Sequence, residues 1–199
     1  LKYFHNTSIV EKRVERSELL GDIVPKIIAS SANFYKYEFV HGTDMFQIDN
    51  QDTLMLRLLN FTRENLWLDV PLTQEQFLFF KGLCVGFYYD RTLSRLSCFR
   101  EKTGIKDSID KINSEAVQST YDLFSKMDWT FISSGCPSVF HGDYHFADIL
   151  ITESESFKLI DWRQDFAGLI GYGDRYYDFA KMYHCLLFPH NSVKDGKYS

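Results

Sequence analysis

The stretch His141-Gly142-Asp143-Tyr144-His145-Phe146-Ala147-Asp148 decides the fold that we expect for this chain of 199 residues. It follows a short run at residues 138–140 that has the composition of a strand. Two further apolar runs, 149–152 and 157–161, are separated by four polar residues and predict a hairpin. A helical pattern covers residues 175–187. This order of strand, polar loop, hairpin and helix predicts an α+β fold with the loop at its centre.

Three aspartates stand at the ends of these expected strands. Asp143 comes just after the first strand, Asp148 lies five residues later, and Asp161 ends the hairpin. Phosphoryl transfer needs a carboxylate that accepts a hydroxyl proton and oxygen ligands that hold Mg²⁺ across nucleotide phosphates. The same spacing is found in the catalytic loop and metal-binding aspartate of protein kinases. We therefore expect Asp143 to be the catalytic base, and Asp148 and Asp161 to be magnesium ligands.

The loop, together with Leu159-Ile160-Asp161-Trp162 and Gly173-Asp174-Arg175-Tyr176-Tyr177-Asp178-Phe179-Ala180, resembles the aminoglycoside phosphotransferase and choline kinase family. The family pattern is His-Gly-Asp-x-His-x-x-Asn, then Ile-Asp-Trp or Ile-Asp-Phe, then Gly-Asp-x-x-x-Asp-Leu-Ala. The resemblance implies that Asp143 is the base and that the aspartate of the second motif is the principal magnesium ligand. It also implies that His141 and Asp178 support the loop. The residues filling the loop resemble bacterial members linked to surface-polysaccharide or choline metabolism.

The resemblance continues toward the N-terminus in shorter motifs. Family members carry a lysine on a strand, then a helix with a glutamate, then a strand that ends in a hinge holding adenine. Lys2 resembles that lysine, and Glu11 or Glu15 resembles its partner on the helix. Glu38 and Val40 fall at the hinge, where they would offer backbone groups to adenine. The resemblance thus implies that Lys2, Glu15, Glu38 and Val40 bind the nucleotide, although a terminal strand lysine is commonly just exposed.

The fold implied by the resemblance is the two-lobed, protein-kinase-like fold. Residues 1–44 would form a partial N-terminal nucleotide-binding lobe with the hinge. Residues 45–199 would form a mainly helical C-terminal lobe that carries the catalytic loop and a short metal-binding hairpin. Capping residues and hydrophobic spacing predict the remaining elements, which are strands at 24–28 and 34–40 and helices at 8–20, 52–66, 73–100 and 108–127.

The chain departs from the family pattern at two points. Asp148 occupies the position usually held by asparagine, so the metal ligand keeps its oxygen but gains a negative charge. The hairpin that would cover the phosphates should precede Lys2, and ATP binding would be impaired without it. Because the sequence starts without Met and ends in Lys194-Asp195-Gly196-Lys197, we expect it to be trimmed at both ends.

Composition excludes several classes of function. A net charge of −5 and a pI near 5.7 argue against a nucleic-acid partner, because phosphate binding depends on clustered lysine and arginine. The four cysteines are widely spaced and form no Cys-x-x-Cys pair, which is typical of reduced thiols in a cytoplasmic protein. No signal-peptide pattern opens the sequence, and the most apolar run, 77–89, is too short to insert in a membrane.

The sequence thus predicts an ATP-dependent phosphotransferase that moves the γ-phosphate to a hydroxyl of a small molecule, with ATP and Mg²⁺ as cofactors. The acceptor would be an amino sugar, choline, ethanolamine or a related metabolite, and the oligomeric state is not specified. One alternative is a pseudokinase or binding module that keeps the fold without turnover. Another is a metal hydrolase with a zinc cluster of His141, Asp143 and His145, although His145 also suits loop packing.

Overall fold

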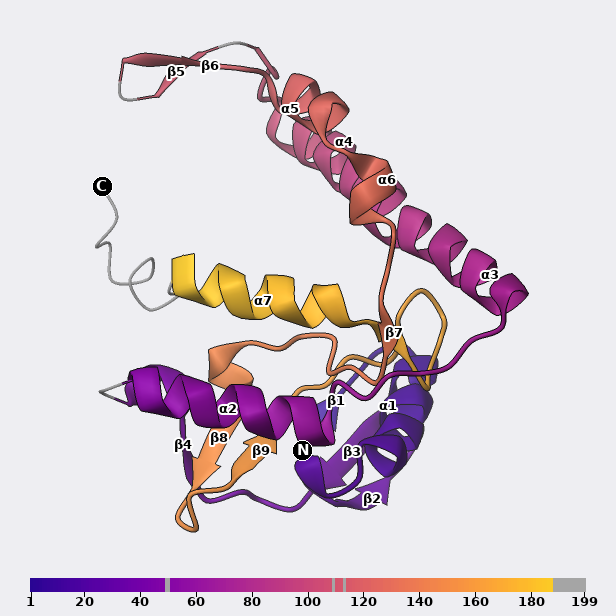
Figure 1. Cartoon of the computed structure of the whole chain (residues 1–199), viewed down its shortest axis with the longest axis vertical. Coiled ribbons are helices and arrows are strands. Elements are labelled where there is room, and N and C mark those ends of the chain that lie inside the picture. The colour runs from indigo at the N-terminus through magenta and orange to yellow at the C-terminus, as the bar shows by residue number, and fades with distance from the viewer. Residues whose placement is uncertain (49–50, 109, 113, 188–199) are drawn as a thin grey trace. The chain divides into compact units, whose positions relative to one another are not determined.

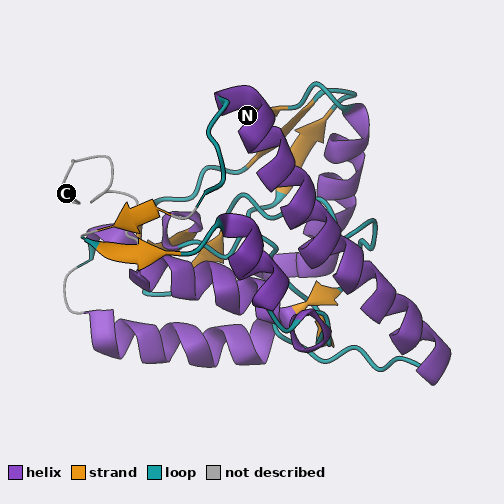
Figure 2. Cartoon of the chain, turned by 90° about the horizontal axis from the view of Figure 1, so that it is seen from above, coloured by secondary structure: helices purple, strands orange, loops and turns teal. Residues whose placement is uncertain are grey.

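The chain folds into helices and short antiparallel strands (Figures 1 and 2), an arrangement compatible with the expected α+β class. The protein-kinase-like arrangement of two lobes stays a prediction. The computed structural model describes residues 1–48, 51–108, 110–112 and 114–187. No helix within these ranges is both long enough and apolar enough to cross a membrane.

Two compact units make up the chain. The first consists of Leu1–Leu72 and Cys136–Ser199, and the second of Thr73–Gly135. The three aspartates singled out in the sequence all belong to the first unit. These two units do not correspond to the expected lobes, and the lobe boundary near residue 44 stays a prediction.

The N-terminal part of the first unit is a small sheet covered by a helix. Its elements are β1 Lys2–Tyr3, α1 Thr7–Leu20, β2 Ile27–Ser30 and β3 Phe34–Tyr37. The strands lie in the order β1-β3-β2 and are all antiparallel, and α1 packs on β2 and β3. Asn6 caps α1 by accepting the backbone N–H of Ser8. The strand with the expected phosphate-binding lysine therefore lies beside the strand that leads into the expected hinge.

The rest of the first unit surrounds the expected catalytic loop. Its elements are β4 Gly42–Asp44, α2 Gln51–Asn65, β7 Pro137–Ser138, β8 Ile149–Thr152, β9 Phe157–Leu159, β10 Gly173–Asp174, α7 Arg175–Leu187, and the short 3-10 turns η1 Gly21–Ile23, η2 Met45–Gln47 and η4 Phe146–Asp148. β8 and β9 form the hairpin that the sequence predicts, β4 adds to it in the order β4-β8-β9, and β7 pairs with β10. The loop thus starts at one sheet and ends at another, which fixes both of its ends.

A buried tryptophan ties the hairpin to the N-terminal sheet. Trp162 follows β9, is fully buried, and lies with its ring centroid 6.0 Å from that of Tyr35 and 6.2 Å from that of Tyr37. Its indole N–H donates to the backbone carbonyl of Arg13 on α1 at 2.8 Å. Burying so large a side chain with its polar atom satisfied stabilises the contact between these segments. The residue just before it, Asp161, is positioned by this anchor.

The second unit is helical. Its elements are α3 Gln74–Val85, the π-helical turn η3 Gly86–Asp90, α4 Arg91–Thr103, β5 Asp110–Ile112, β6 Glu115–Val117, α5 Thr120–Lys126 and α6 Trp129–Ile132. A capping box between Thr73 and Gln76 starts α3, as expected from the sequence, and the helical run continues through η3 to the end of α4. α5 and α6 pack back along this run through the rings of Tyr89, Phe124 and Trp129.

The sequence-based prediction of a helix over residues 108–127 is wrong. The chain forms a β5–β6 hairpin there, with Ser114 in the left-handed region at φ 68°, and only α5 is helical. Ser119 starts α5 by accepting the N–H of Asp122, and Asp107 accepts the N–H groups of Thr120 and Tyr121. These side-chain acceptors favour a helix start at residue 120 over a continuous helix. β2 also begins later than predicted, because Pro25 has no N–H for a strand ladder.

Candidate functional site

The expected catalytic loop makes a sharp turn at Gly142. Its φ is 90°, which favours glycine, and an added Cβ would lie 2.5 Å from the Cβ of Arg163. The backbone N–H of Arg163 donates to the carbonyl of His141 at 2.9 Å. The loop and the segment after β9 therefore approach each other closely, and only glycine leaves room for this contact.

A buried carboxylate holds the start of the loop. Asp178, in the first turn of α7, accepts the backbone N–H groups of His141 and Gly142, each at 2.7 Å, and the indole N–H of Trp67 at 3.3 Å. Burial raises the pKa of Asp178 to about 6, although these hydrogen bonds and the nearby charge of Arg16 oppose the shift. The structure thus places Asp178 where the resemblance implied, as a support of the loop.

His141 is locked in one neutral form. Its Nε2 lies 2.9 Å from the carbonyl oxygen of Ile160, and its Nδ1 accepts the backbone N–H of Asp143 at 3.3 Å. The first contact requires a proton on Nε2, and the second leaves Nδ1 unprotonated. Burial, with the nearby charge of Arg16, lowers the pKa of His141 to about 4. The imidazole therefore links the loop to the end of the hairpin and orients the backbone at Asp143.

Arg16 connects α1 to both sides of this turn. Only 1% of the residue is exposed, and its guanidinium donates to the carbonyl oxygens of Phe140 and Arg163. It also lies 4.0 Å from the ring centroid of Phe140. Burial lowers the pKa of Arg16 to about 10, so it remains charged near neutrality. In the sequence, Lys12, Arg13 and Arg16 are interrupted by Glu11 and Glu15, which indicates a solvated helix face. For Arg16 this interpretation is wrong, because the backbone carbonyls of two loop segments bind its guanidinium in the interior.

Asp161 meets the N-terminal strand. The Nζ of Lys2 lies 2.5 and 2.6 Å from its two carboxylate oxygens, and Arg13 Nη1 lies 3.8 Å from one of them. Asp161 has a φ of 60°, a conformation that asparagine and aspartate tolerate better than most residues. Its side chain is 32% exposed, so the carboxylate remains accessible. Two segments 159 residues apart are therefore joined at this carboxylate.

Asp143 has a partner that the sequence analysis missed. The Nζ of Lys181 on α7 lies 2.7 Å from Asp143 Oδ1. Nearly half of the Asp143 side chain is exposed, so the second oxygen is open to approach. Lys181 follows Asp178 by three residues, and residues at this spacing share one face of a helix. That spacing was the available signal, because Asp178 was already expected to face the loop.

The carboxyl group of Asp148 is partly buried and interacts electrostatically with Asp161 and Asp143. Burial, followed by the charges of Asp161 and Asp143, raises the pKa of Asp148 to about 7, while Lys2 and Lys181 act in the opposite direction. Such charge effects require the groups to lie close together in the fold. The backbone N–H of Ile160 donates to the carbonyl of Asp148 at 2.9 Å, which places Asp148 beside the segment that leads to Asp161.

The other residues expected to bind nucleotide have different surroundings. Glu15 is exposed on α1, and Lys2 pairs with Asp161 rather than with a glutamate of this helix. The reason is that α1 buries Val10, Arg16 and Leu20, which leaves its glutamates exposed on the opposite face. Glu38 is exposed and Val40 half-buried, beyond the end of β3, and the backbone N–H of Glu38 donates to the carbonyl of Lys26 at 3.0 Å.

The carboxylates of Asp148 and Asp161 are oxygen ligands of the type that Mg²⁺ prefers. Within the described residues, no group of three or more histidine, cysteine, aspartate or glutamate side chains is placed to hold a metal ion. Magnesium needs only one or two carboxylates when nucleotide phosphates and water complete its shell. Asp148 and Asp161 offer oxygens of this type, and the pKa of Asp148 is raised first by burial and then by the negative charges of Asp161 and Asp143.

The contacts of His141 and His145 contradict the alternative of a zinc cluster in the loop. Both ring nitrogens of His141 are engaged by Ile160 and Asp143. The Nδ1 of His145 lies 3.1 Å from the Sγ of Cys185, and the residue is buried. The two histidines therefore pack the loop and do not form a zinc cluster with the aspartate between them.

Compared with protein-family models, curated proteins and solved structures, the chain matches none of them. The resemblance to aminoglycoside phosphotransferases and choline kinases therefore rests on the motifs of the chain itself.

Proposed function

We propose that this chain belongs to an ATP- and magnesium-dependent phosphotransferase with a protein-kinase-like fold, which phosphorylates a hydroxyl of a small molecule. The observation that carries the proposal is that both ends of the loop, near Asp143 and at Asp148, are hydrogen-bonded to the segment around Asp161, which pairs with Lys2 of the first strand. Phosphoryl transfer depends on positioning and charge stabilisation, and these groups supply both.

Asp143 would act as the base. Its Oδ1 is held by Lys181, so Oδ2 would accept the proton of the acceptor hydroxyl as the acceptor oxygen bonds to the γ-phosphorus of ATP and the bond from that phosphorus to ADP breaks. The hydrogen bond from the Asp143 N–H to His141 fixes the backbone at this residue. A half-exposed carboxylate on a well-anchored loop combines access for an acceptor with fixed geometry.

Asp148 and Asp161 would hold the magnesium ion. When bound, Mg²⁺ would neutralise charge on the nucleotide phosphates. Lys2 pairs with Asp161, and from this position its ammonium group would also bind phosphate oxygens of the nucleotide. Glu38 and Val40 would contact adenine through backbone groups beyond β3, the strand next to the one with Lys2.

The acceptor would be an amino sugar, choline, ethanolamine or a related metabolite, as the resemblance implies. A cluster of carboxylates favours an acceptor that carries a positive amino or ammonium group. The pseudokinase, which keeps the fold without turnover, is the other outcome that the following test distinguishes.

The test is magnesium-dependent ATP turnover by the full-length gene product, measured with a panel of amino sugars, choline and ethanolamine. We expect phosphorylated acceptor to form, and to be lost in the Asp143→Asn and Asp161→Asn proteins. The Asp22→Asn protein is the matched control, because Asp22 is exposed and outside the cluster. Absence of nucleotide binding and turnover with every acceptor would refute the enzyme and favour the binding module.

A further inference from the structure

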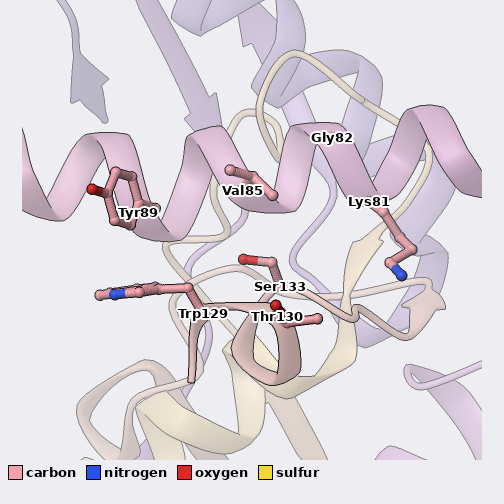
Figure 3. A pocket seen from close by; sticks show the side chains of 7 residues that line it. All are labelled: Lys81, Gly82, Val85, Tyr89, Trp129, Thr130 and Ser133. Atoms are coloured by element: carbon pink, nitrogen blue, oxygen red, sulfur yellow. The ribbon is translucent and has the colours of Figure 1, made fainter. Parts of the chain in front are cut away.

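The second unit contains a pocket of about 410 Å³ that the proposed phosphotransferase reaction does not use (Figure 3). It lies between the helical run of α3 and η3 on one side and α6 on the other. Its lining residues all belong to this unit and are Lys81, Gly82, Val85, Tyr89, Trp129, Thr130 and Ser133. The volume is within the range of small-molecule sites.

One end of the pocket is aromatic. The ring centroids of Tyr89 and Trp129 lie 5.1 Å apart with the rings at 89°, and Figure 3 shows both at the same end. The indole N–H of Trp129 donates to the carbonyl of Phe124 at 2.9 Å, which fixes the ring. The aromatic end therefore offers rigid apolar faces, suited to a flat ring.

A buried hydroxyl lines the middle of the pocket. Ser133 is only 2% exposed, and its Oγ has no hydrogen-bond partner among the residues that the structure describes. Figure 3 shows its side chain in the space between α3 and α6, next to Thr130. A buried hydroxyl without a partner has lost its hydrogen bonds to water and gained none in return, which lowers stability. A ligand atom that accepts from this hydroxyl would recover that loss.

The other end of the pocket carries a positive charge. Lys81 lies there, away from the aromatic pair (Figure 3), and its side chain is half-buried. None of the carboxylates in the described ranges lies within ion-pair distance of it. The pocket thus offers aromatic faces at one end, a hydroxyl donor in the middle and a cation at the other end, with no carboxylate in its lining.

We infer that this pocket binds a small aromatic carboxylate. The ring would lie against Trp129 and Tyr89, and the carboxylate would accept from Lys81 Nζ and Ser133 Oγ. An amine would meet Lys81 with like charge, and a neutral amide would lose the charge-assisted contact. The inference does not depend on the proposed function, because all of the lining residues lie outside the unit that holds the three aspartates.

Phenylacetate is a suitable probe, with phenylacetamide and 2-phenylethylamine as its neutral and cationic counterparts. Binding to the full chain would be followed through the three indole N–H signals in NMR spectra, with the Trp129→Phe protein assigning one of them. We expect phenylacetate to shift the Trp129 signal saturably, leaving those of Trp67 and Trp162 in place. Both counterparts should bind about tenfold more weakly or worse.

Three substitutions test which side chains contact the bound phenylacetate. The Lys81→Met protein should bind phenylacetate about tenfold more weakly, whereas Lys102→Met, at an exposed position of α4, should bind it as the unmodified chain does. Ser133→Ala should weaken binding several-fold without lowering the free energy of unfolding, because the lost hydroxyl has no partner in the free protein. An unchanged Trp129 signal at saturating phenylacetate, or equal binding by Lys81→Met or phenylacetamide, would overturn the inference.

Discussion

Replacing Asp148 with asparagine tests whether folding disfavours ionisation of this carboxyl group in the metal-free protein. The pKa of Asp148 rises from 3.8 to about 7 on folding, chiefly through burial and then through the charges of Asp161 and Asp143. A raised pKa in a folded acid means that ionisation is less favourable in the folded than in the unfolded chain. The wild-type protein should therefore lose stability as the pH rises from about 4 through about 7.

The size of the effect follows from the shift. About 3 pK units at about 1.4 kcal/mol each give an upper limit of about 4 kcal/mol. Asp148 is only partly buried and Lys2 and Lys181 can move, so about half of this, ~2 kcal/mol, is expected after screening. The Asp148→Asn protein lacks this ionisation. The free energy of unfolding of Asp148→Asn should equal that of the wild type at about pH 4. At about pH 8 it should be higher by ~2 kcal/mol.

The assay is urea unfolding in the presence of EDTA, followed by fluorescence of the buried Trp67 and Trp162 across this pH range. Asp22→Asn, at an exposed position of the same unit, should differ from the wild type by less than about 0.5 kcal/mol at every pH. Added Mg²⁺ should narrow the difference at high pH, because a bound cation offsets the repulsion. A difference for Asp148→Asn that does not grow with pH would refute the reasoning.

Three further substitutions test the frame around the loop. Arg16→Met leaves the carbonyls of Phe140 and Arg163 without their donor and should lower the free energy of unfolding by about 3 kcal/mol, measured by urea denaturation. Gly142→Ala should lower it by more than about 2 kcal/mol in the same assay, since φ is 90° and the new Cβ meets Arg163 at 2.5 Å. Lys181→Met frees the catalytic-loop carboxylate and should reduce kcat at least about tenfold in the ATP turnover assay, with the unfolding midpoint little changed.

Local patterns predicted the part of the site that is built from neighbouring residues. The hairpin of β8 and β9 and the extent of α1 agree with the sequence analysis, and the contact of Asp178 with the loop agrees with the family resemblance. The capping box that Ser8 and Glu11 predict for α1 is wrong, because Asn6 caps this helix. Turn residues, capping residues and hydrophobic spacing act over a few positions, so they can be read directly from the sequence. The helix predicted over residues 108–127 failed because the side chains of Asp107 and Ser119 bind backbone groups that a continuous helix would use.

The sequence by itself determined which carboxylates stand beside the loop, because their spacing along the chain sets their places at strand ends. Only the tertiary structure decided that Lys181 pairs with Asp143, that Lys2 meets Asp161 across 159 residues, and that Arg16 lies buried beneath the turn. The physical reason is that a charge in a sequence carries no information on its partner. Packing of the helices against the sheets chooses the partner, and burial then sets the strength of the contact.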